Sequence, residues 1–371
     1  MGPTVGIVGG GQLAWMLLPA AARLGIRTVL LCGPDDPATT LTSDVEVGKP
    51  DAEGLRRLAA RCDVVTVEHE LVDRDTMREL EAEGTAVWPN ADTLDIANDK
   101  IRQREVLGAA GVPLAPWARV TTRADLDAFI AVHGPGLTLK RPSGGYDGRG
   151  VWFANGADQA AQVLDQAGEP LLVEPKLDFE RELATLVVRR PGGQTAVYDP
   201  VQTLQRDGMC REVRLPAPVP DHVADQARQV GVQVAKAVGS VGNLAIELFY
   251  VDGNVLFNEI AARPHNAGHV TIEAAVTSQF ENHLRGVCDL PLGSTATRQP
   301  GAMVNVVGAQ DVSDPRERLA QALDVDDVAV HLYGKATRPA RKLGHVTAVG
   351  ASTNDALKRA RQAAAILNGD A

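Results

Sequence analysis

The alternation of apolar and polar positions along the chain predicts an N-terminal α/β domain. Short apolar runs such as TVGIVG and RTVLLC are separated by amphipathic segments, of which GGQLAWMLLPAAARLG is the longest. Apolar runs of this length between helical segments are typical of buried strands in a parallel sheet. We therefore expect residues 1–95 to form a parallel sheet with helices on both faces.

The pattern changes after a helical connector near residues 91–111. Residues 117–172 predict strand–helix–strand on each side of a glycine-rich loop, a unit small enough to be a mobile lid. Beyond it, β-rich segments such as ELATLVVRR predict a largely antiparallel sheet covered by the helix DHVADQARQVGVQVAKAVG. The expected fold is thus α/β followed by α+β, with a connector and lid at residues 96–173. A β-rich platform with a terminal β-rich subdomain is expected at residues 174–371.

Composition and charge exclude several classes of protein. The net charge of −10 over 371 residues argues against general binding to nucleic acid or anionic membranes. No apolar run reaches the length of a membrane span, and the N-terminus lacks the pattern of a signal peptide. The four cysteines are far apart, as expected for reduced thiols of a cytoplasmic protein. An acidic chain that binds an anion must therefore concentrate its cations locally.

The segment LKRPSGGYDGRG, residues 139–150, is the first candidate site. Its four glycines allow backbone N–H groups to approach a ligand closely. The flanking Lys140 and Arg149 indicate an anionic ligand, most simply a phosphate. An exposed, flexible hairpin with incidental charges is the alternative.

A second glycine motif, GGGQLA at residues 9–14, fits the strand–turn–helix pattern of dinucleotide-binding domains. That pattern expects an acidic residue at the end of the second strand, but this strand ends in Cys32-Gly33-Pro34. A nicotinamide-dependent oxidoreductase is therefore only an alternative. A tight turn, or contact with a smaller ligand, is favoured.

Glu247 and Glu259 interrupt two otherwise apolar strands of a predicted hairpin. Buried carboxylates usually need a partner, and two together suggest a divalent cation shared with substrate phosphates. A two-residue turn at 252–253 would pair Glu247 with Asn258, whereas a three-residue loop at 252–254 would pair it with Glu259. A metal site thus needs the longer loop or a bulge. Two carboxylates at an exposed edge are the alternative.

Two clusters of cations and hydrogen-bond donors follow this hairpin. They could be ordinary solvated loops, but they also offer what an anionic substrate needs in an acidic chain. The clusters are Arg263, His265, Asn266 and His269 in ARPHNAGH, and Lys335, Arg338, Arg341, Lys342 and His345 in HLYGKATRPARKLGH.

Together these motifs resemble those of the ATP-grasp superfamily and, within it, the N5-carboxyaminoimidazole ribonucleotide synthetases of purine biosynthesis. The resemblance runs from GIVGGGQLA to KLGHVTAVG, and NEIAARPHNAGH, TSQFENHLR and HLYGKATRPARKLGH are its most specific parts. It implies an ATP-grasp fold in which lid and platform enclose MgATP. It also implies a cytoplasmic, homodimeric, ADP-forming ligase that carboxylates aminoimidazole ribonucleotide with bicarbonate through carboxyphosphate.

The resemblance also implies roles for individual residues. The ATP-binding set is Lys100, Lys140, Gly145, Tyr146, Asp147, Gly148, Arg149, Gly150, Glu174, Leu177, Glu182, Gln205, Asn258 and Glu259. Within it, Lys140 would contact phosphates, Glu174 and Leu177 would line the base, and Glu182 would bind the ribose. Glu247 and Glu259 would hold Mg²⁺. The residues for bicarbonate and catalysis would be Arg263, His265, Asn266 and Lys342. The ribonucleotide would be held by Gln12, Glu68 or Glu70, Tyr146, Lys335, Arg341 and Lys342.

Several positions depart from the family pattern. Lys100 stands where arginine is usual, Gln205 where histidine is usual, and Ala267 where a serine is usual. Trp15 and Pro175 replace a basic residue and an N–H donor. None of these changes removes a proposed metal ligand or the lid lysine. They leave open a paralogous ATP-grasp ligase for another small amine, and a nucleotide-binding regulator without turnover is a further alternative.

Overall fold

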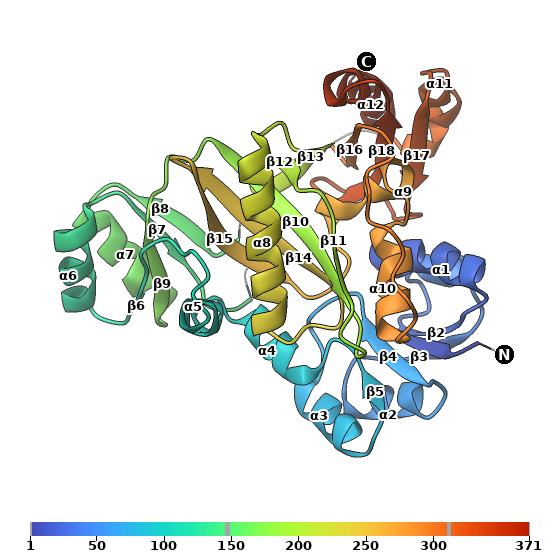
Figure 1. The fold of residues 1–371 in the computed structure, drawn as a ribbon, viewed down its shortest axis with the longest axis horizontal. Coiled ribbons are helices and arrows are strands. Elements are labelled where there is room, and N and C mark those ends of the chain that lie inside the picture. Colours follow the sequence, from blue (N-terminus) through green and yellow to red (C-terminus); the bar gives the residue numbers. More distant parts are fainter. Residues whose placement is uncertain (1, 145–148, 310–312, 371) are drawn as a thin grey trace.

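The computed structural model describes residues 2–144, 149–309 and 313–370, whose strands form three sheets (Figure 1). The N-terminal sheet has the strand order β3-β2-β1-β4-β5, and all its neighbouring strands are parallel, as predicted. Its strands are β1 (Thr4–Val8), β2 (Arg27–Cys32), β3 (Val45–Val47), β4 (Val64–Val67) and β5 (Ala86–Val87).

Helices connect these strands. α1 (Gln12–Leu24) follows the glycine turn directly and ends at Gly25, whose φ of 66° forms a left-handed cap. α2 (Ala52–Ala59) and α3 (Arg74–Ala82) begin at aspartates whose carboxylates accept backbone N–H groups of the first turn. The short 3₁₀ helix η1 (Pro37–Thr40) follows β2.

The predicted helical connector consists of two helices, α4 (Ala91–Asn98) and α5 (Lys100–Ala109). The helices meet at Asp99, whose extended backbone ends α4 and whose carboxylate caps α5. This break makes Lys100 the first residue of α5.

The lid sheet is small and antiparallel, with the order β6-β9-β7-β8. Figure 1 shows it at one end of the molecule, with α6 and α7 beside it. Its elements are β6 (Ala118–Val120), α6 (Arg123–His133), β7 (Leu137–Lys140), β8 (Val151–Ala154), α7 (Ala157–Ala167) and β9 (Leu171–Pro175). The predicted domain borders at residues 95 and 173 fall inside α4 and β9. A domain border placed between elements would therefore lie a few residues away from each predicted position.

The platform sheet is antiparallel and has the order β15-β14-β10-β12-β13-β16-β18-β17, with β11 beside β10. The predicted terminal β-rich segment belongs to it, because β13 pairs with β16. The strands are β10 (Arg181–Arg189), β11 (Thr195–Val197), β12 (Val201–Arg206), β13 (Met209–Leu215), β14 (Gly242–Val251), β15 (Asn254–Ala261), β16 (Gly301–Val307), β17 (Val328–Leu332) and β18 (Lys342–Val349).

Helices pack against the platform sheet, and α8 (Asp221–Ala237) lies across strands β10, β14 and β15 (Figure 1). Among the described helices, none is long and apolar enough to cross a membrane. The remaining elements are η2 (Asn266–Gly268), α9 (Thr271–Ala274), α10 (Gln279–Val287), η3 (Pro315–Arg318), α11 (Leu319–Leu323) and α12 (Thr353–Asn368).

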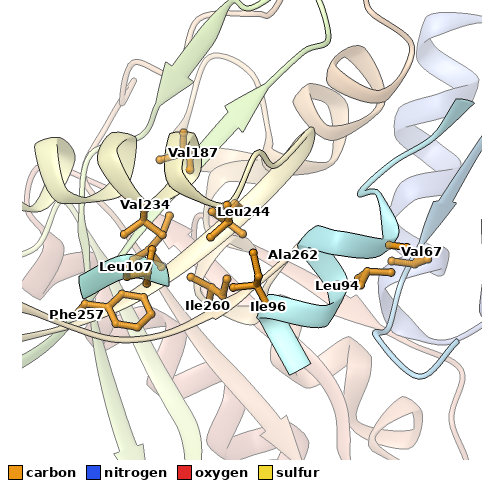
Figure 2. Packing of buried hydrophobic residues seen from close by; sticks show 14 of the residues in the cluster. Val67, Leu94, Ile96, Leu107, Val187, Val234, Leu244, Phe257, Ile260 and Ala262 are labelled. Carbon is orange, nitrogen blue, oxygen red and sulfur yellow. The ribbon is translucent and has the colours of Figure 1, made fainter. Parts of the chain in front are cut away.

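One apolar core joins the N-terminal sheet, the connector and the platform (Figure 2). Val67 of β4 and Leu94 of α4 belong to it, as do Leu107 of α5, Val234 of α8 and Phe257 of β15. Because the connector helices are buried in this core, they hold the first residue of α5 and the end of β15 in fixed relation.

Candidate active site

The β14–β15 hairpin brings the two candidate metal-binding carboxylates together. Its turn is the two-residue type at residues 252–253. The register then shifts beside Glu247, and this β-bulge leaves Asn258 as the extra residue. Glu247 consequently pairs with Glu259. Either a longer loop or a bulge would allow a metal site here, and the structure has the bulge.

A third carboxylate lies on the same face of the platform sheet. Ala184 of β10 pairs with Glu247, and Glu182 lies two residues before it, so both glutamates share a face. Burial raises the pKa of Glu182 to about 7. Burial, together with the negative charges of Glu259 and Glu182, also raises the pKa of Glu247. The shift of Glu247 indicates that negative charge is in excess on this face.

This arrangement fits a divalent cation that a nucleotide shares. Mg²⁺ is usually held by one or two carboxylates together with substrate phosphates, and Glu247 and Glu259 supply two carboxylates. Within the described ranges, no three His, Cys, Asp or Glu side chains are grouped to hold a metal ion alone. Phosphate oxygens would therefore have to complete the coordination.

Two lysines approach this acidic face. Lys140, the last residue of β7, is buried; its Nζ lies 2.7 Å from Glu174 Oε2 and donates to Asn258 Oδ1 at 3.0 Å. Burial lowers the pKa of Lys140. Lys100 forms an ion pair with Glu259. Burial opposes ionisation of Glu259, but the charge of Lys100 lowers its pKa. The lysine that replaces the family's arginine thus holds a proposed metal ligand.

The glycine-rich loop is described only in part. Gly145, Tyr146, Asp147 and Gly148 lie outside the described residues, so their predicted contacts with ATP and ribonucleotide stay predictions. Gly150 has a φ of 76°, and its carbonyl accepts a hydrogen bond from the backbone N–H of Arg141 at 2.8 Å. The loop therefore starts and ends at the paired ends of β7 and β8.

The predicted adenine-binding residues lie on β9 and just beyond it. Glu174 is buried and its carboxylate is held by Lys140 and by Arg104 of α5, so contact with a base would have to come from its backbone. Leu177 is half-buried just beyond β9. Gln205 lies on β12 where the register with β13 shifts. The roles of these residues in binding ATP stay predictions.

The N-terminal glycine turn holds a carboxylate from the same chain. Glu68, buried at the end of β4, accepts hydrogen bonds from the backbone N–H groups of Gly11 and of Ala14, the latter at 2.8 Å. A Cβ atom at Gly9 would lie 2.3 Å from the Glu68 side chain. The glycines therefore make room for Glu68 at the N-terminus of α1. A dinucleotide pyrophosphate would have to displace this carboxylate, which argues against the oxidoreductase.

Arg263 and His265 lie between the acidic face of the platform and the N-terminal sheet. Arg263 Nε donates to Glu70 Oε2 at 2.8 Å, so the two glutamates of VEHE have different partners. His265 Nε2 lies 3.6 Å from Glu247 Oε1, and its backbone N–H donates to the Gln279 side chain at 2.9 Å. Burial, followed by the charge of Arg263, lowers the pKa of His265 to about 3. The ring is therefore neutral near pH 7.

Asn266, also predicted to bind bicarbonate, makes its contacts inside the platform. Its amide exchanges two hydrogen bonds with that of Asn305 on β16, at 3.0 and 2.7 Å. Asn305 also donates to the carbonyl of Cys210 at 2.9 Å. The Asn266 side chain thus links η2 to the sheet, and its contact with a substrate stays a prediction.

The predicted ribonucleotide site joins the two ends of the chain. Lys335 Nζ donates to Gln12 Oε1 at 2.7 Å and lies 5.5 Å from the centre of the Tyr333 ring. The Tyr333 ring in turn packs edge-on against Trp15. Burial, then the charge of Arg341, lowers the pKa of Lys335 to about 8.

The remaining basic residues differ in their surroundings. Arg341 is half-buried and donates to the carbonyl of Ala336 at 3.2 Å, and Lys342 begins β18. His269 and His345 are fully buried, with ring centres 5.0 Å apart, and burial lowers the pKa of each well below its usual value. These two histidines are neutral and do not contribute to a cationic patch.

Sequence reasoning did not identify Arg104, which is buried and bonded to Glu174. One signal was present: Lys100 and Arg104 lie four residues apart on α5 and thus on one face. Like charges at this spacing normally repel, so their presence on a buried helix indicates acidic partners.

Protein-family models match most of the chain. The model described as "Ribonucleotide synthetase preATP-grasp domain" matches residues 2–98, and "ATP-grasp domain" matches residues 105–280. "Phosphoribosylaminoimidazole carboxylase C-terminal domain" matches residues 301–359.

Curated relatives extend this similarity over the full length. The N5-carboxyaminoimidazole ribonucleotide synthase of Mycobacterium bovis is 43% identical, over 98% of this chain and 87% of the relative. The protein of the same name from Synechococcus elongatus is 38% identical, over 98% of this chain and 93% of the relative.

Solved structures show the same fold. N5-carboxyaminoimidazole synthase from Aspergillus clavatus, in complex with ADP and 5-aminoimidazole ribonucleotide, matches with a TM-score of 0.91 at 32% identity and covers 99% of both chains. The synthetase from Thermus thermophilus matches with a TM-score of 0.87 at 36% identity, over 98% of this chain and 97% of that one. The sheets, the glycine loop and the basic motifs thus have one common explanation: this chain belongs to the N5-carboxyaminoimidazole ribonucleotide synthase family of ATP-grasp ligases.

Proposed function

We propose that this chain converts ATP, bicarbonate and aminoimidazole ribonucleotide into ADP, phosphate and N5-carboxyaminoimidazole ribonucleotide in purine biosynthesis. One observation supports this most directly: Glu247 pairs with Glu259 beside Lys140. Arg263 and His265 follow on the segment beyond β15. The acidic pair would accommodate a metal–nucleotide complex, and the adjoining donors would accommodate a small anion.

The first half-reaction asks the protein mainly to position ATP and neutralise its phosphates. Glu247 and Glu259 would hold Mg²⁺, which when bound offsets negative charge on the phosphates. Lys140 would contact the phosphates from the lid side. A bicarbonate oxygen attacks the γ-phosphorus, the bond to the β-phosphate oxygen breaks, and ADP leaves, which forms carboxyphosphate.

In the second half-reaction the exocyclic amine attacks the carboxyl carbon of carboxyphosphate. The C–O bond to phosphate breaks, phosphate leaves, and the amine loses a proton. Arg263 supplies a fixed positive charge for the anion, and neutral His265 can donate or accept one hydrogen bond without adding charge. Carboxyphosphate hydrolyses readily, so the loop between β7 and β8 would serve to exclude water.

The ribonucleotide phosphate needs a cationic site, for which Lys335, Arg341 and Lys342 are the candidates. Gln12 would orient Lys335 across the junction between the N-terminal sheet and the platform. On the family resemblance we also propose that the protein is a homodimer, and on its four separated cysteines that it is cytoplasmic.

The decisive experiment measures ADP formation with aminoimidazole ribonucleotide, with and without bicarbonate. The proposal requires turnover that depends on both compounds. ADP formation with a different amine would favour the paralogue. ATP binding without ADP formation for any amine would favour a regulator, and NADH binding without ATP binding would favour the oxidoreductase.

The pKa of Lys335 predicts a pH dependence. An ammonium group with a pKa of about 8 is charged below that pH and neutral above it. Affinity for the ribonucleotide phosphate should therefore fall by about fivefold from pH 8 to pH 9, because the charged fraction of Lys335 falls from about one half to about one eleventh. Lys335→Arg, which stays charged, should flatten this profile, while the KM for ATP should not change with pH in either protein. Identical profiles for the two proteins would contradict this role.

Restoring serine at position 267, where the family usually has it, tests whether this side chain contacts a substrate. The Ala267 side chain is 1% exposed and belongs to an apolar cluster with Ala184 and Val213. Ala267→Ser should therefore change turnover by less than about tenfold, as one neutral hydrogen bond allows. The buried hydroxyl should instead lower the free energy of unfolding by about 1–3 kcal/mol unless it finds a partner. Steady-state kinetics and thermal melting separate the two effects, and a larger rate change would place a substrate at this side chain.

A further inference from the structure

Arg104 is a buried cation for which the proposed mechanism has no use so far. It is the largest fully buried side chain among the described residues, with an exposure of 1%. Its Nε and Nη2 atoms donate to the same oxygen of Glu174, Oε1, at 2.9 and 2.7 Å. The guanidinium also lies 5.0 Å from the centre of the Phe257 ring. Burying a charge is unfavourable unless it is paired, so Arg104 depends on Glu174 for its place in the core.

Glu174 is shared between two cations. Its other oxygen, Oε2, lies 2.7 Å from Lys140 Nζ. Two buried cations thus face one buried carboxylate, and the group as a whole carries an excess positive charge. Moreover, Arg104 Nη1 is buried without a hydrogen-bond partner in the part of the chain that the structure describes. An excess of positive charge is what a group that binds anionic phosphates requires.

The group also lies where the lid sheet meets the platform. Arg104 comes from the connector helix α5, Lys140 and Glu174 come from β7 and β9 of the lid sheet, and Asn258 comes from β15 of the platform. The Glu174 carboxylate therefore fixes Lys140 relative to α5, and the hydrogen bond from Lys140 to Asn258 fixes it relative to the hairpin.

We propose that Arg104 is a positioning residue that binds one oxygen of Glu174 and thereby leaves the charge of Lys140 available to nucleotide phosphates. Without Arg104, the carboxylate and the ammonium would form a closed, neutral pair. A phosphate would then have to compete with Glu174 for Lys140. This inference rests on the proposed function, because it assumes that Lys140 binds ATP.

The test compares binding of a non-hydrolysable ATP analogue and of adenosine by isothermal titration. Arg104→Met keeps an unbranched apolar stem and removes the charge. We expect it to weaken binding of the analogue at least tenfold and to change adenosine binding by less than twofold. Arg104→Lys should restore part of the affinity for the analogue. In a Lys140→Met background, Arg104→Met should have little further effect on the analogue.

A purely structural role predicts a different result, because misfolding near the site would weaken the analogue and adenosine by the same factor. Equal loss for both ligands, or wild-type affinity for the analogue, would overturn the inference. Thermal melting identifies variants that do not fold, and Arg104→Lys, which keeps the buried charge, then provides the comparison with adenosine. These outcomes differ from failure of the proposed function, in which the wild-type protein binds the analogue normally but forms no ADP with bicarbonate and the ribonucleotide.

Discussion

Glu259→Gln is expected to lower turnover by about 10²-fold or more, the usual effect of losing a preorganised charged group. Glutamine keeps the volume of the side chain but removes one of the two negative charges paired across the β14–β15 hairpin. A Mg²⁺ ion shared with the nucleotide would then lose a ligand, and the γ-phosphate would be misplaced. Bicarbonate-dependent ADP formation measures the loss.

The stability of this variant should change little. The Glu259 side chain is 38% exposed, so its ion pair with Lys100 contributes at most about 1 kcal/mol. The substitution also relieves repulsion from Glu247, which acts in the opposite direction. Glu46→Gln is the matched control, since Glu46 pairs with Arg57 and Arg61 at the edge of the N-terminal sheet. Near-normal turnover of Glu259→Gln would return this residue to a structural role.

The hairpin shows how far sequence patterns define a site. Apolar alternation predicted both strands and showed that Glu247 could face Glu259 only through a longer loop or a bulge. The choice depends on packing, because the turn residues Asp252 and Gly253 favour two-residue turns and a bulge has no comparable local signal. The possible pairing of the two carboxylates was therefore predictable, and the bulge that creates it was not.

Long-range contacts set the other limit. The glycines of GGGQLA are explained by Glu68, 57 residues beyond Gly11, which a motif cannot reveal. Likewise, the side chain of Asn266 binds Asn305, although the motif ARPHNAGH groups it with Arg263 and His265. Motifs supplied the candidate residues of the site. Only the fold shows which side chains bind each other within the protein.

Arg341→Ala is expected to weaken binding of the ribonucleotide by about 10- to 100-fold, because a hydrogen bond to a charged group contributes roughly 1.5–3 kcal/mol. Arg341 is half-buried before β18, and Lys335, whose pKa its charge helps to lower, lies near it. A guanidinium can bind two phosphate oxygens in one planar, bidentate geometry, which a lysine ammonium does not offer. The KM for the ribonucleotide measures the effect, and affinity for MgATP should stay within about twofold.

The same loop provides a control for general electrostatic attraction. Arg338 is exposed and lies three residues before Arg341, so Arg338→Ala removes the same charge outside the proposed phosphate site. If the loop attracts the substrate only through its net charge, both substitutions should raise KM by similar small factors, and added salt should remove the difference from wild type. A specific site predicts a large change for Arg341 alone that salt reduces only partly. Equal effects would therefore remove Arg341 from the ribonucleotide site and leave Lys335 and Lys342 as the phosphate-binding residues.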